Sequence, residues 1–248
     1  MKTGDETFSI LFLAKELRKL KKVFTLMKIG LLGAVLFGGY HFITTGSLPN
    51  PLAVVAQGNA QTASSSGKLI SRDFAETANK VLPQAGPPLL LQTDERWGDI
   101  SYGTESENND LAHNGCAIAS LAMIASYWQG QTVTPPEILD WAQNNYYVTG
   151  QGTSWQIFSD FAPQYGLQVQ SLASIEQAEE WMQTGHPVIV SVNPGTFTKT
   201  GHIMVLAMNE GKLTVYDPND DSHKQHYQTD FSEDIFRNEA VSYWVFYK

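Results

Sequence analysis

Three residues of the chain have the types and the order that a thiol hydrolase needs. Cys116 is the only cysteine among 248 residues, and it follows Gly115 at the start of an apolar run. A thiol nucleophile needs a base within hydrogen-bond reach and a third group that orients the base. His202 and Asp217 supply an imidazole and a carboxylate downstream. The three residues therefore predict acyl transfer, with Cys116 as the nucleophile.

The position of Cys116 in a predicted helix supports this chemistry. Residues 116–128 are apolar or small on nearly every side, which is typical of a helix buried in the centre of a domain. Unpaired backbone N–H groups and the positive end of the helix dipole favour a negatively charged sulfur at its first residue. A free cysteine is also commonly just a small buried residue. Its position alone leaves both interpretations open.

A predicted hairpin brings His202 and Asp217 together. His202 begins one β-branched run and Asp217 ends the next, across the turn Asn209–Gly211. With Glu210 at the centre of the turn, antiparallel pairing places Asp217 opposite Ile203 and beside His202. A histidine at a strand start is often only an edge residue, and the Asp-Pro-Asn-Asp sequence is a good turn by itself. Chain order and register together favour the catalytic interpretation.

The remaining histidines are weaker candidates for the base. His113 lies close to Cys116 in sequence, where the turn into the helix could direct it toward the sulfur or away from it, and it stays the rival base. His186, His223 and His226 have no carboxylate neighbour that the register would position, and His41 lies in the N-terminal apolar run. The His, Cys, Asp and Glu residues show no metal-ligand spacing. The sequence thus predicts no metal and no organic cofactor.

The elements around these residues change from helices to strands along the chain. Further helices are expected from Pro135, over about 154–165 and over 174–184, with proline in a first turn and a Ser174/Gln177 capping box. Short β-branched runs follow over 188–192, 202–208, 212–216 and 242–247. Helices followed by antiparallel strands indicate an α+β domain.

The first 46 residues differ from the rest in charge and hydropathy. They hold seven basic and three acidic residues, which leaves nine basic and 22 acidic residues for the remainder. Residues 1–28 are a predicted cytoplasmic basic segment, and residues 29–46 are a predicted transmembrane signal-anchor or signal peptide. Extended back to Val23, the apolar run reaches the roughly 20 residues that cross a membrane. Positive charge stays in the cytoplasm, so the C-terminal domain should be extracellular.

Whether the N-terminal segment is cleaved decides between two locations. Val54-Val55-Ala56 offers small residues to a signal peptidase, and cleavage there would give a secreted protein. That site lies far beyond the end of the apolar run, which favours an uncleaved, single-pass anchor in the cell membrane. Both outcomes place the domain outside the cell, where a lone thiol has no internal partner in an oxidising compartment.

A polar tract separates the anchor from the folded domain. Residues 47–88 are predicted to be a flexible tether, with a possible short helix over 69–82, and the domain is expected to span 89–248. The chain has a net charge of -9, and its acidic part lacks the clustered positive charge that phosphate binding needs. Nucleic acid is therefore excluded as a partner, and the membrane is expected through the N-terminal segment.

Four stretches of the domain together resemble the C39-like peptidase domain. They are Gln92–Gly98, Asn114–Met123, Gly201–Val205 and Val215–Pro218. The resemblance implies a papain-like fold, with a central N-terminal helix packed on an antiparallel sheet. It also implies Cys116 as nucleophile, His202 as base, Asp217 as orienting acid and Gln92 as oxyanion donor. Gln92 fits equally well as a domain-entry residue whose amide bonds to the backbone.

The resemblance leaves the substrate open. Well-known members of the wider family are fused to an export transporter and trim leader peptides after a Gly-Gly pair, whereas this sequence shows no nucleotide-binding domain and no multi-span region. The expected protein is a bacterial thiol hydrolase that acts on a peptide or a cell-wall peptide. A catalytically inactive binding module at the cell surface and a peptidoglycan-directed amidase are the alternatives.

Overall fold

The computed structural model describes residues 60–248, with side chains from residue 71 onward. The predicted cytoplasmic segment 1–28 and the predicted anchor 29–46 lie outside the described residues, as does the tether as far as residue 59. In the part that is described, no helix is both long and apolar enough to cross a membrane.

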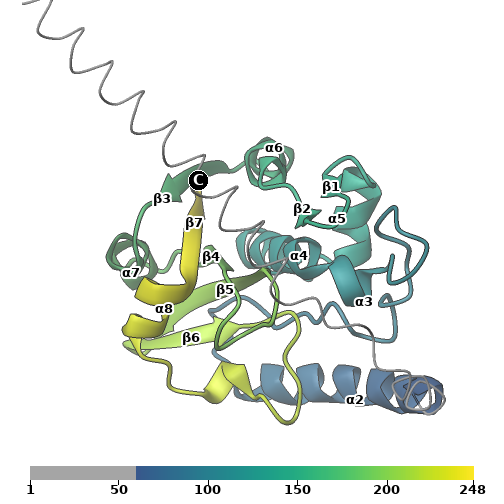
Figure 1. The fold of residues 1–248 in the computed structure, drawn as a ribbon. Coiled ribbons are helices and arrows are strands. Elements are labelled where there is room, and N and C mark those ends of the chain that lie inside the picture. The colour runs from purple at the N-terminus through teal and green to yellow at the C-terminus, as the bar shows by residue number, and fades with distance from the viewer. Residues whose placement is uncertain (1–59) are drawn as a thin grey trace, which may run out of the picture. The chain divides into compact units, whose positions relative to one another are not determined.

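A five-stranded antiparallel sheet forms the centre of the domain, in the order β3-β7-β4-β5-β6 (Figure 1). Its strands are β3 (Gln168–Leu172), β4 (Val188–Val192), β5 (His202–Asn209), β6 (Lys212–Tyr216) and β7 (Ala240–Tyr247). Every residue of β4 is buried, because this strand lies in the middle of the sheet and both of its faces are covered.

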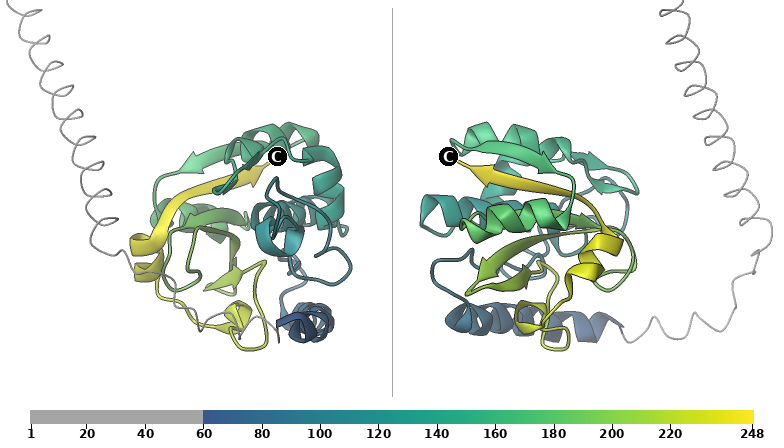
Figure 2. Two further views of the ribbon diagram at one scale, coloured as in Figure 1. Left: turned by 45° about the vertical axis from the view of Figure 1, so that its right-hand side comes forward. Right: turned by 90° about the vertical axis from the view of Figure 1, so that its left-hand side faces the viewer.

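Helices cover both faces of the sheet, and two hydrophobic cores result (Figure 2). The first core includes Ile203 and Val205 of β5, and the second includes Met204 and Leu206 of the same strand, as strand alternation requires. The first face carries α4 (Cys116–Gln129), α5 (Pro135–Ala142) and α6 (Gln156–Gln164). The second carries α7 (Ile175–Gln183) and α8 (Glu233–Glu239).

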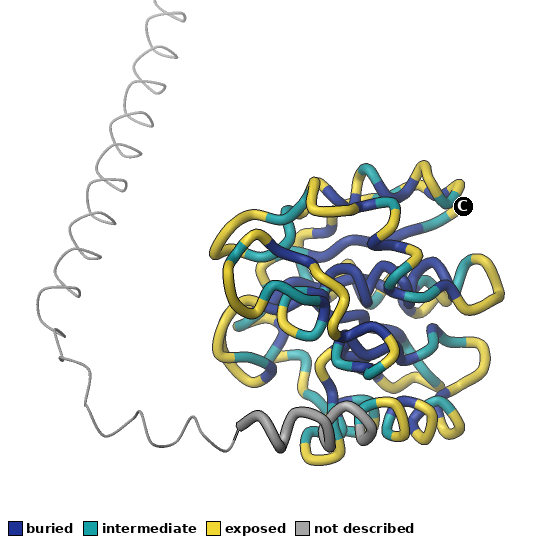
Figure 3. The backbone as a smooth tube through the Cα atoms, turned by 90° about the vertical axis from the view of Figure 1, so that its right-hand side faces the viewer, coloured by how far each residue is buried: buried dark blue, intermediate teal, exposed yellow. Residues whose placement is uncertain are grey.

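Helix α4 lies at the centre of the first core. All residues from Ala117 to Ser126 are buried, which is why its sequence shows no polar face. Burial is concentrated in the middle of the domain, as Figure 3 shows. The α+β class, with a central helix packed on an antiparallel sheet, is confirmed.

The β5–β6 hairpin has a shorter loop than the sequence indicated. Asn209 pairs with Lys212, so only Glu210 and Gly211 form the loop. Both have positive φ angles, 51° and 79°, as a two-residue type I′ turn requires. The three-residue turn centred on Glu210 was therefore wrong, and the register of the hairpin differs by one residue from the predicted one.

Helix α2 (Ala60–Val81) is longer than the short helix predicted over 69–82. Ala75 and Ala78 lie on one face of this helix, and they are buried, with Leu82 just after it, in the same core as α4. The Asn79 side chain holds both backbone groups of Leu89, at 2.7 and 2.9 Å. This part of the chain therefore differs from the flexible tether predicted over 47–88.

Several short elements were absent from the sequence prediction. Strand β3 consists mostly of Gln and Ser at an exposed edge of the sheet, so it lacks the apolar run that marks a strand. Helix α8 buries only Phe236, and the Ser232 side chain caps its first turn. The others are α3 (Leu111–Asn114), β1 (Tyr147–Val148), β2 (Gly152–Thr153) and the 3-10 helix η3 (His226–Gln228).

Candidate active site

Cys116 is the first residue of α4 and is partly buried. Gly115 joins α3 to α4, and a Cβ atom added to it would lie 2.4 Å from the carbonyl oxygen of Leu111. Only glycine lets the two helices meet this closely. The N-cap position supplies no side-chain hydrogen bond to α4, so the helix directs its first N–H groups and its positive dipole end toward the region of the sulfur.

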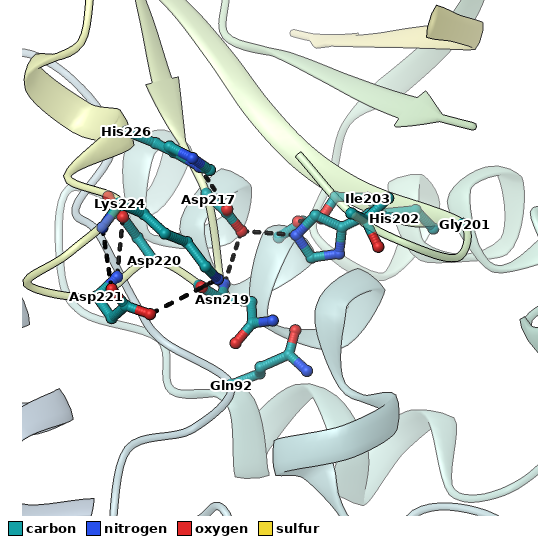
Figure 4. A network of polar contacts seen from close by, with 12 residues as sticks. Gln92, Gly201, His202, Ile203, Asp217, Asn219, Asp220, Asp221, Lys224 and His226 are labelled. Carbon is teal, nitrogen blue, oxygen red and sulfur yellow. Dashed lines mark hydrogen bonds and ion pairs between the residues drawn. The ribbon is translucent and has the colours of Figure 1, made fainter. Parts of the chain in front are cut away.

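His202 and Asp217 form a buried pair beside this helix end. Nε2 of His202 lies 2.6 Å from Oδ1 of Asp217, and the two residues are 7% and 0% exposed (Figure 4). His202 is the first residue of β5 and pairs with Val192 of β4. Asp217 follows the last residue of β6. The hairpin thus brings the imidazole and the carboxylate together.

The observed register explains the contact better than the predicted one. Val205 pairs with Tyr216, and continuing that register aligns Asp217 with Met204 instead of Ile203. Because side chains alternate between the two faces of a strand, His202 and Met204 share a side. The shift of one residue therefore puts the carboxylate and the imidazole on the same side of the hairpin.

The Asp217 carboxylate accepts three hydrogen bonds. Besides His202, the backbone N–H of Asn219 donates to Oδ1 at 2.7 Å, and Nδ1 of His226 lies 2.8 Å from Oδ2. The Asn219 bond comes from the tight turn after β6, which the Asp-Pro-Asn-Asp sequence favours. A fully buried carboxylate has no access to water, so these donors take the place of its hydration shell.

These contacts raise the pKa of His202 and lower the pKa of Asp217. Burial alone would lower the pKa of His202, but the charge and hydrogen bond of Asp217, together with Cys116, raise it from 6.5 to about 10. Burial would likewise raise the pKa of Asp217, but His202, His226 and Asn219 hold it well below its usual range. At neutral pH the pair is therefore an imidazolium and a carboxylate.

Gln92 lies next to the turn that carries Asp217. Its backbone N–H donates to the carbonyl oxygen of Pro218 at 2.7 Å, and its side-chain Nε2 donates to that of Ala112 at 2.7 Å. Gln92 is 3% exposed, and its Oε1 has no hydrogen-bond partner among the described residues. The backbone-binding role weighed in the sequence is thus present. A primary amide has two N–H groups, and the Ala112 bond uses one of them.

His113, the rival base, lies in a different environment from His202. Nδ1 of His113 lies 2.6 Å from Oδ1 of Asp110, and the His113 side chain is 52% exposed. The same carboxylate caps the short helix α3. His186 instead bonds to Thr184 and lies against Trp181. The structure therefore gives His202, and not His113, the buried contact with Asp217.

Sequence reasoning missed His226. It was set aside because no carboxylate was placed near it by register, yet it bonds to the Asp217 carboxylate itself. The hairpin register says nothing about the chain after β6, which turns at Asp217–Asp220 and returns as η3 beside that strand. The strong turn sequence after β6 was the only available signal that the chain folds back.

Comparison with known proteins gives a family match. The family model described as Peptidase_C39 like family matches residues 94–246. The matched range contains Cys116, His202, Asp217 and His226, while Gln92 and α2 precede it. No curated protein matches the chain.

Three solved structures of similar proteins are peptidases or peptidase domains by title. The peptidase domain of Streptococcus ComA, a bi-functional ABC transporter in quorum sensing, is 18% identical with a TM-score of 0.40, over 58% of this chain and 93% of that one. A double-glycine-motif protease from an AMS/PCAT transporter, in complex with the leader peptide, is 20% identical with a TM-score of 0.38, over 53% of this chain and 83% of that one. A putative C39-like peptidase from Bacillus anthracis is 18% identical with a TM-score of 0.36, over 52% of this chain and 88% of that one.

Proposed function

Because the chain belongs to the Peptidase_C39-like family, we propose that it is a papain-like cysteine peptidase or amide hydrolase. In this proposal Cys116 is the nucleophile, His202 the base and Asp217 the orienting acid. One observation carries it: the buried 2.6 Å contact between His202 Nε2 and Asp217 Oδ1, and Cys116 is one of the groups that raise the pKa of His202. The carboxylate occupies Nε2, which leaves Nδ1 as the ring nitrogen that serves the sulfur.

In the acylation step, the Cys116 thiolate attacks the carbonyl carbon of the substrate amide. A carbon–sulfur bond forms, and the carbonyl electrons move to the oxygen. When the tetrahedral intermediate collapses, the carbon–nitrogen bond breaks and His202 gives its Nδ1 proton to the leaving amine. The products of this step are a free amine and a thioester on Cys116.

In the deacylation step, water replaces the amine. Neutral His202 takes a proton from the water molecule as its oxygen attacks the thioester carbon. The carbon–sulfur bond then breaks, and Cys116 leaves as a thiolate beside the protonated imidazole. The acid product departs, and the starting ion pair is restored. Asp217 remains ionised throughout and stabilises the imidazolium.

The negative oxygen of the tetrahedral intermediate needs hydrogen-bond donors. The backbone N–H of Cys116 at the start of α4 is one, and the second N–H of the Gln92 amide is the other in this proposal. Gln92 is tied to Ala112 just before α4, so its amide is fixed in the same neighbourhood. Loss of one oxyanion donor typically lowers turnover about 10²–10³-fold, which is the loss expected for Gln92→Ala.

The proposal is tested with the full-length protein on two kinds of material, casein and purified cell wall. New amino groups should appear with the wild-type protein on at least one of them, and none with Cys116→Ala or His202→Ala. Casein cleavage supports a peptidase, whereas cleavage of wall material alone supports an amidase that acts on stem peptides. Lys199→Ala, a charge change on the nearby loop, serves as the matched control and should retain activity.

A thiol-directed activity probe covers the case in which neither material contains the substrate. Cys116 is the only cysteine, so labelling of the folded protein reports this one sulfur. Equal labelling by the probe of folded and urea-unfolded wild-type protein at neutral pH would show an unactivated thiol. That result contradicts catalysis and leaves the inactive binding module.

We propose further that the domain acts outside the cytoplasmic membrane, on peptide or cell-wall peptide substrates. The support is the charge asymmetry of residues 1–46 and the apolar run that follows their basic part. Protease added to intact cells should remove the domain and leave a small membrane-bound fragment. Recovery of the mature protein from culture medium, beginning near Gln57, would show cleavage instead. Protection of the domain inside intact cells would contradict the proposed location.

A further inference from the structure

We propose that His226 is a positioning residue of the active site, which holds the Asp217 carboxylate in the orientation that serves His202. The inference rests on the proposed function and adds a fourth side chain to it. Nδ1 of His226 lies 2.8 Å from Oδ2 of Asp217, while Nε2 of His202 lies 2.6 Å from Oδ1 (Figure 4). Each carboxylate oxygen therefore has its own imidazole.

The chemistry of the carboxylate fixes where the protons are. An ionised carboxylate only accepts hydrogen bonds, so Nδ1 of His226 and Nε2 of His202 must both carry a proton. His226 does not compete with His202, because it occupies the oxygen that His202 leaves free. The carboxylate is thereby held at both ends and cannot rotate away from either ring.

The surroundings of His226 hold its ring in place. The residue is 8% exposed, and the rings of Phe197 and Phe231 meet it edge to face, with centroids 5.5 and 5.4 Å away. The following residue is also fixed, because the backbone N–H of Tyr227 donates to Asp220 at 3.2 Å. Asp220 itself is 1% exposed. The contact with Asp217 is thus built into a packed region and is not a surface encounter.

Removal of this donor should disturb the charge that supports His202. Asp217 is 0% exposed, so without His226 its Oδ2 would be a buried, charged acceptor that water cannot reach, which disfavours the ionised form. The charged and titratable groups around Asp217 are His202 from β5, His226 from η3 and Asp220 from the turn. Cys116 of α4 acts on it through His202. A weaker carboxylate charge destabilises the thiolate–imidazolium pair.

The test measures how fast iodoacetamide alkylates Cys116 across the pH range, in the full-length protein. No substrate is needed, and the single cysteine makes the rate specific. His226→Phe keeps an aromatic ring against Phe197 and Phe231 but removes the donor. His226→Asn supplies an amide N–H near the position of Nδ1. His223→Phe changes an exposed histidine of the same connection and is the matched control.

The acid limb of the profile is expected to move to higher pH in His226→Phe. A lost hydrogen bond to a buried charge corresponds to a shift of about one to two pH units, which is a rate loss of about 5- to 50-fold at the wild-type midpoint. His226→Asn should restore most of the rate, and His223→Phe should match the wild type. A purely structural role would lower the active fraction without moving the limb.

The outcomes separate this inference from the proposed function. A wild-type profile like that of an ordinary thiol, with one limb at about pH 8.5, overturns the proposed function and the role of His226 with it. An activated wild-type thiol whose profile is unchanged in His226→Phe overturns the role of His226 alone. A shifted profile in His226→Phe, with rescue by His226→Asn, supports both.

A second measurement needs no variant, in case His226→Phe fails to fold. Nitrogen NMR of the labelled wild-type protein shows which ring nitrogen of His226 carries a proton. The inference requires a protonated Nδ1 whose hydrogen exchanges slowly with water. A neutral His226 with its proton on Nε2 alone could not donate to Asp217 and would overturn the inference.

Discussion

Asp94 and Asp217 are both fully buried carboxylates, but their partners differ in kind. Asp94 accepts two hydrogen bonds from the Arg96 guanidinium, at 2.6 and 2.8 Å, and a third from the Arg96 backbone N–H. Asp217 faces the imidazoles of His202 and His226 instead. Burial and hydrogen bonding are similar at the two sites. The partners differ in chemistry and in exposure, because the Arg96 side chain is 44% exposed whereas His202 and His226 are buried.

This difference decides which of the two carboxylates fits the proposed reaction. Arg96 stays charged at every pH at which the protein is folded, and Asp94 raises its pKa further through their hydrogen bond. The Asp94–Arg96 pair therefore fixes the loop after Leu91 and cannot transfer a proton. An imidazole gains and loses a proton within reach of neutral pH. Asp217 thus influences the charge of His202, the group that acts on Cys116 in the proposed mechanism.

The largest expected effect is on activity when Asp217 becomes Asn. The asparagine amide would present an N–H to the His202 imidazole, which favours the wrong tautomer of that ring. The substitution also removes the negative charge that stabilises protonated His202. By analogy with hydrolytic triads, kcat/KM should fall about 10³–10⁴-fold. The measurement is the initial rate of amine release from the substrate found in the digestion assay.

Asp94→Asn is the matched control for this loss of a buried charge. Its kcat/KM should stay within about twofold of the wild-type value, because no reacting group depends on Asp94. A comparable loss of activity in both variants would break the distinction between the two carboxylates.

The second effect is on stability, and it is expected at Asp94, where the effect on activity is small. Asp94→Asn should lower the free energy of unfolding by about 1–3 kcal/mol, since it removes the charged acceptor of a two-point contact. The lower part of the range is expected, because the Arg96 side chain is 44% exposed and can turn to water. Urea unfolding followed by tryptophan fluorescence measures the change. A cost below a few tenths of a kcal/mol would show that the buried pair does not stabilise the fold.

The third effect is the dependence of stability on pH. His202 has a raised pKa, from 6.5 to about 10, so its contribution is complete below pH 6.5 and is lost as the pH rises toward 10. Asp217 has a lowered pKa, from 3.8, so its contribution is present above that value and is lost in acid. The wild-type free energy of unfolding should therefore be greatest between these limits.

Asp217→Asn gives this prediction its control. Without the carboxylate, His202 loses the main cause of its raised pKa, and most of the decline between pH 6.5 and 10 should disappear. Asp94→Asn should retain that decline, because its partner does not titrate there. Parallel curves for the wild type and Asp217→Asn across this window would contradict the assignment of the decline to His202.

The smallest effect is expected at the third acid–base pair, Asp110 and His113. Its histidine side chain is 52% exposed, and exposed ion pairs contribute only about 0–1 kcal/mol. His113→Ala should therefore leave kcat/KM within about twofold and change the unfolding free energy little. A loss of activity as large as that of His202→Ala would restore His113 as the base.

The strongest signals in the sequence predicted the central features of the fold. The apolar stretch after Cys116 and the β-branched runs around Glu210 indicated α4 and the β5–β6 hairpin, because burial on all sides and strand pairing leave clear patterns. Strand β3 and helix α8 were missed, because each is short and buries little apolar surface. Helix α2 was underestimated for a similar reason, since its buried face consists mainly of small alanines.

The candidate site shows the same division between local and long-range information. The His202–Asp217 contact was predictable from the hairpin, although the register was off by one residue. His226 was not, because its place depends on how the chain folds back after the Asp217 turn. The Gln92 contact with Ala112 joins a loop to the short helix α3, 20 residues along the chain, and no periodicity encodes such a contact.

Helix α2 shows that the folding unit and the family match have different boundaries. The matched range begins at residue 94, but Ala75, Ala78 and Leu82 lie in the core that also surrounds α4. A recombinant fragment that started at Leu89 would lose the Asn79 side chain that pairs both of its backbone groups. It would also expose apolar surface beneath α2. Expression work should therefore retain the chain from residue 60, well before the family match begins.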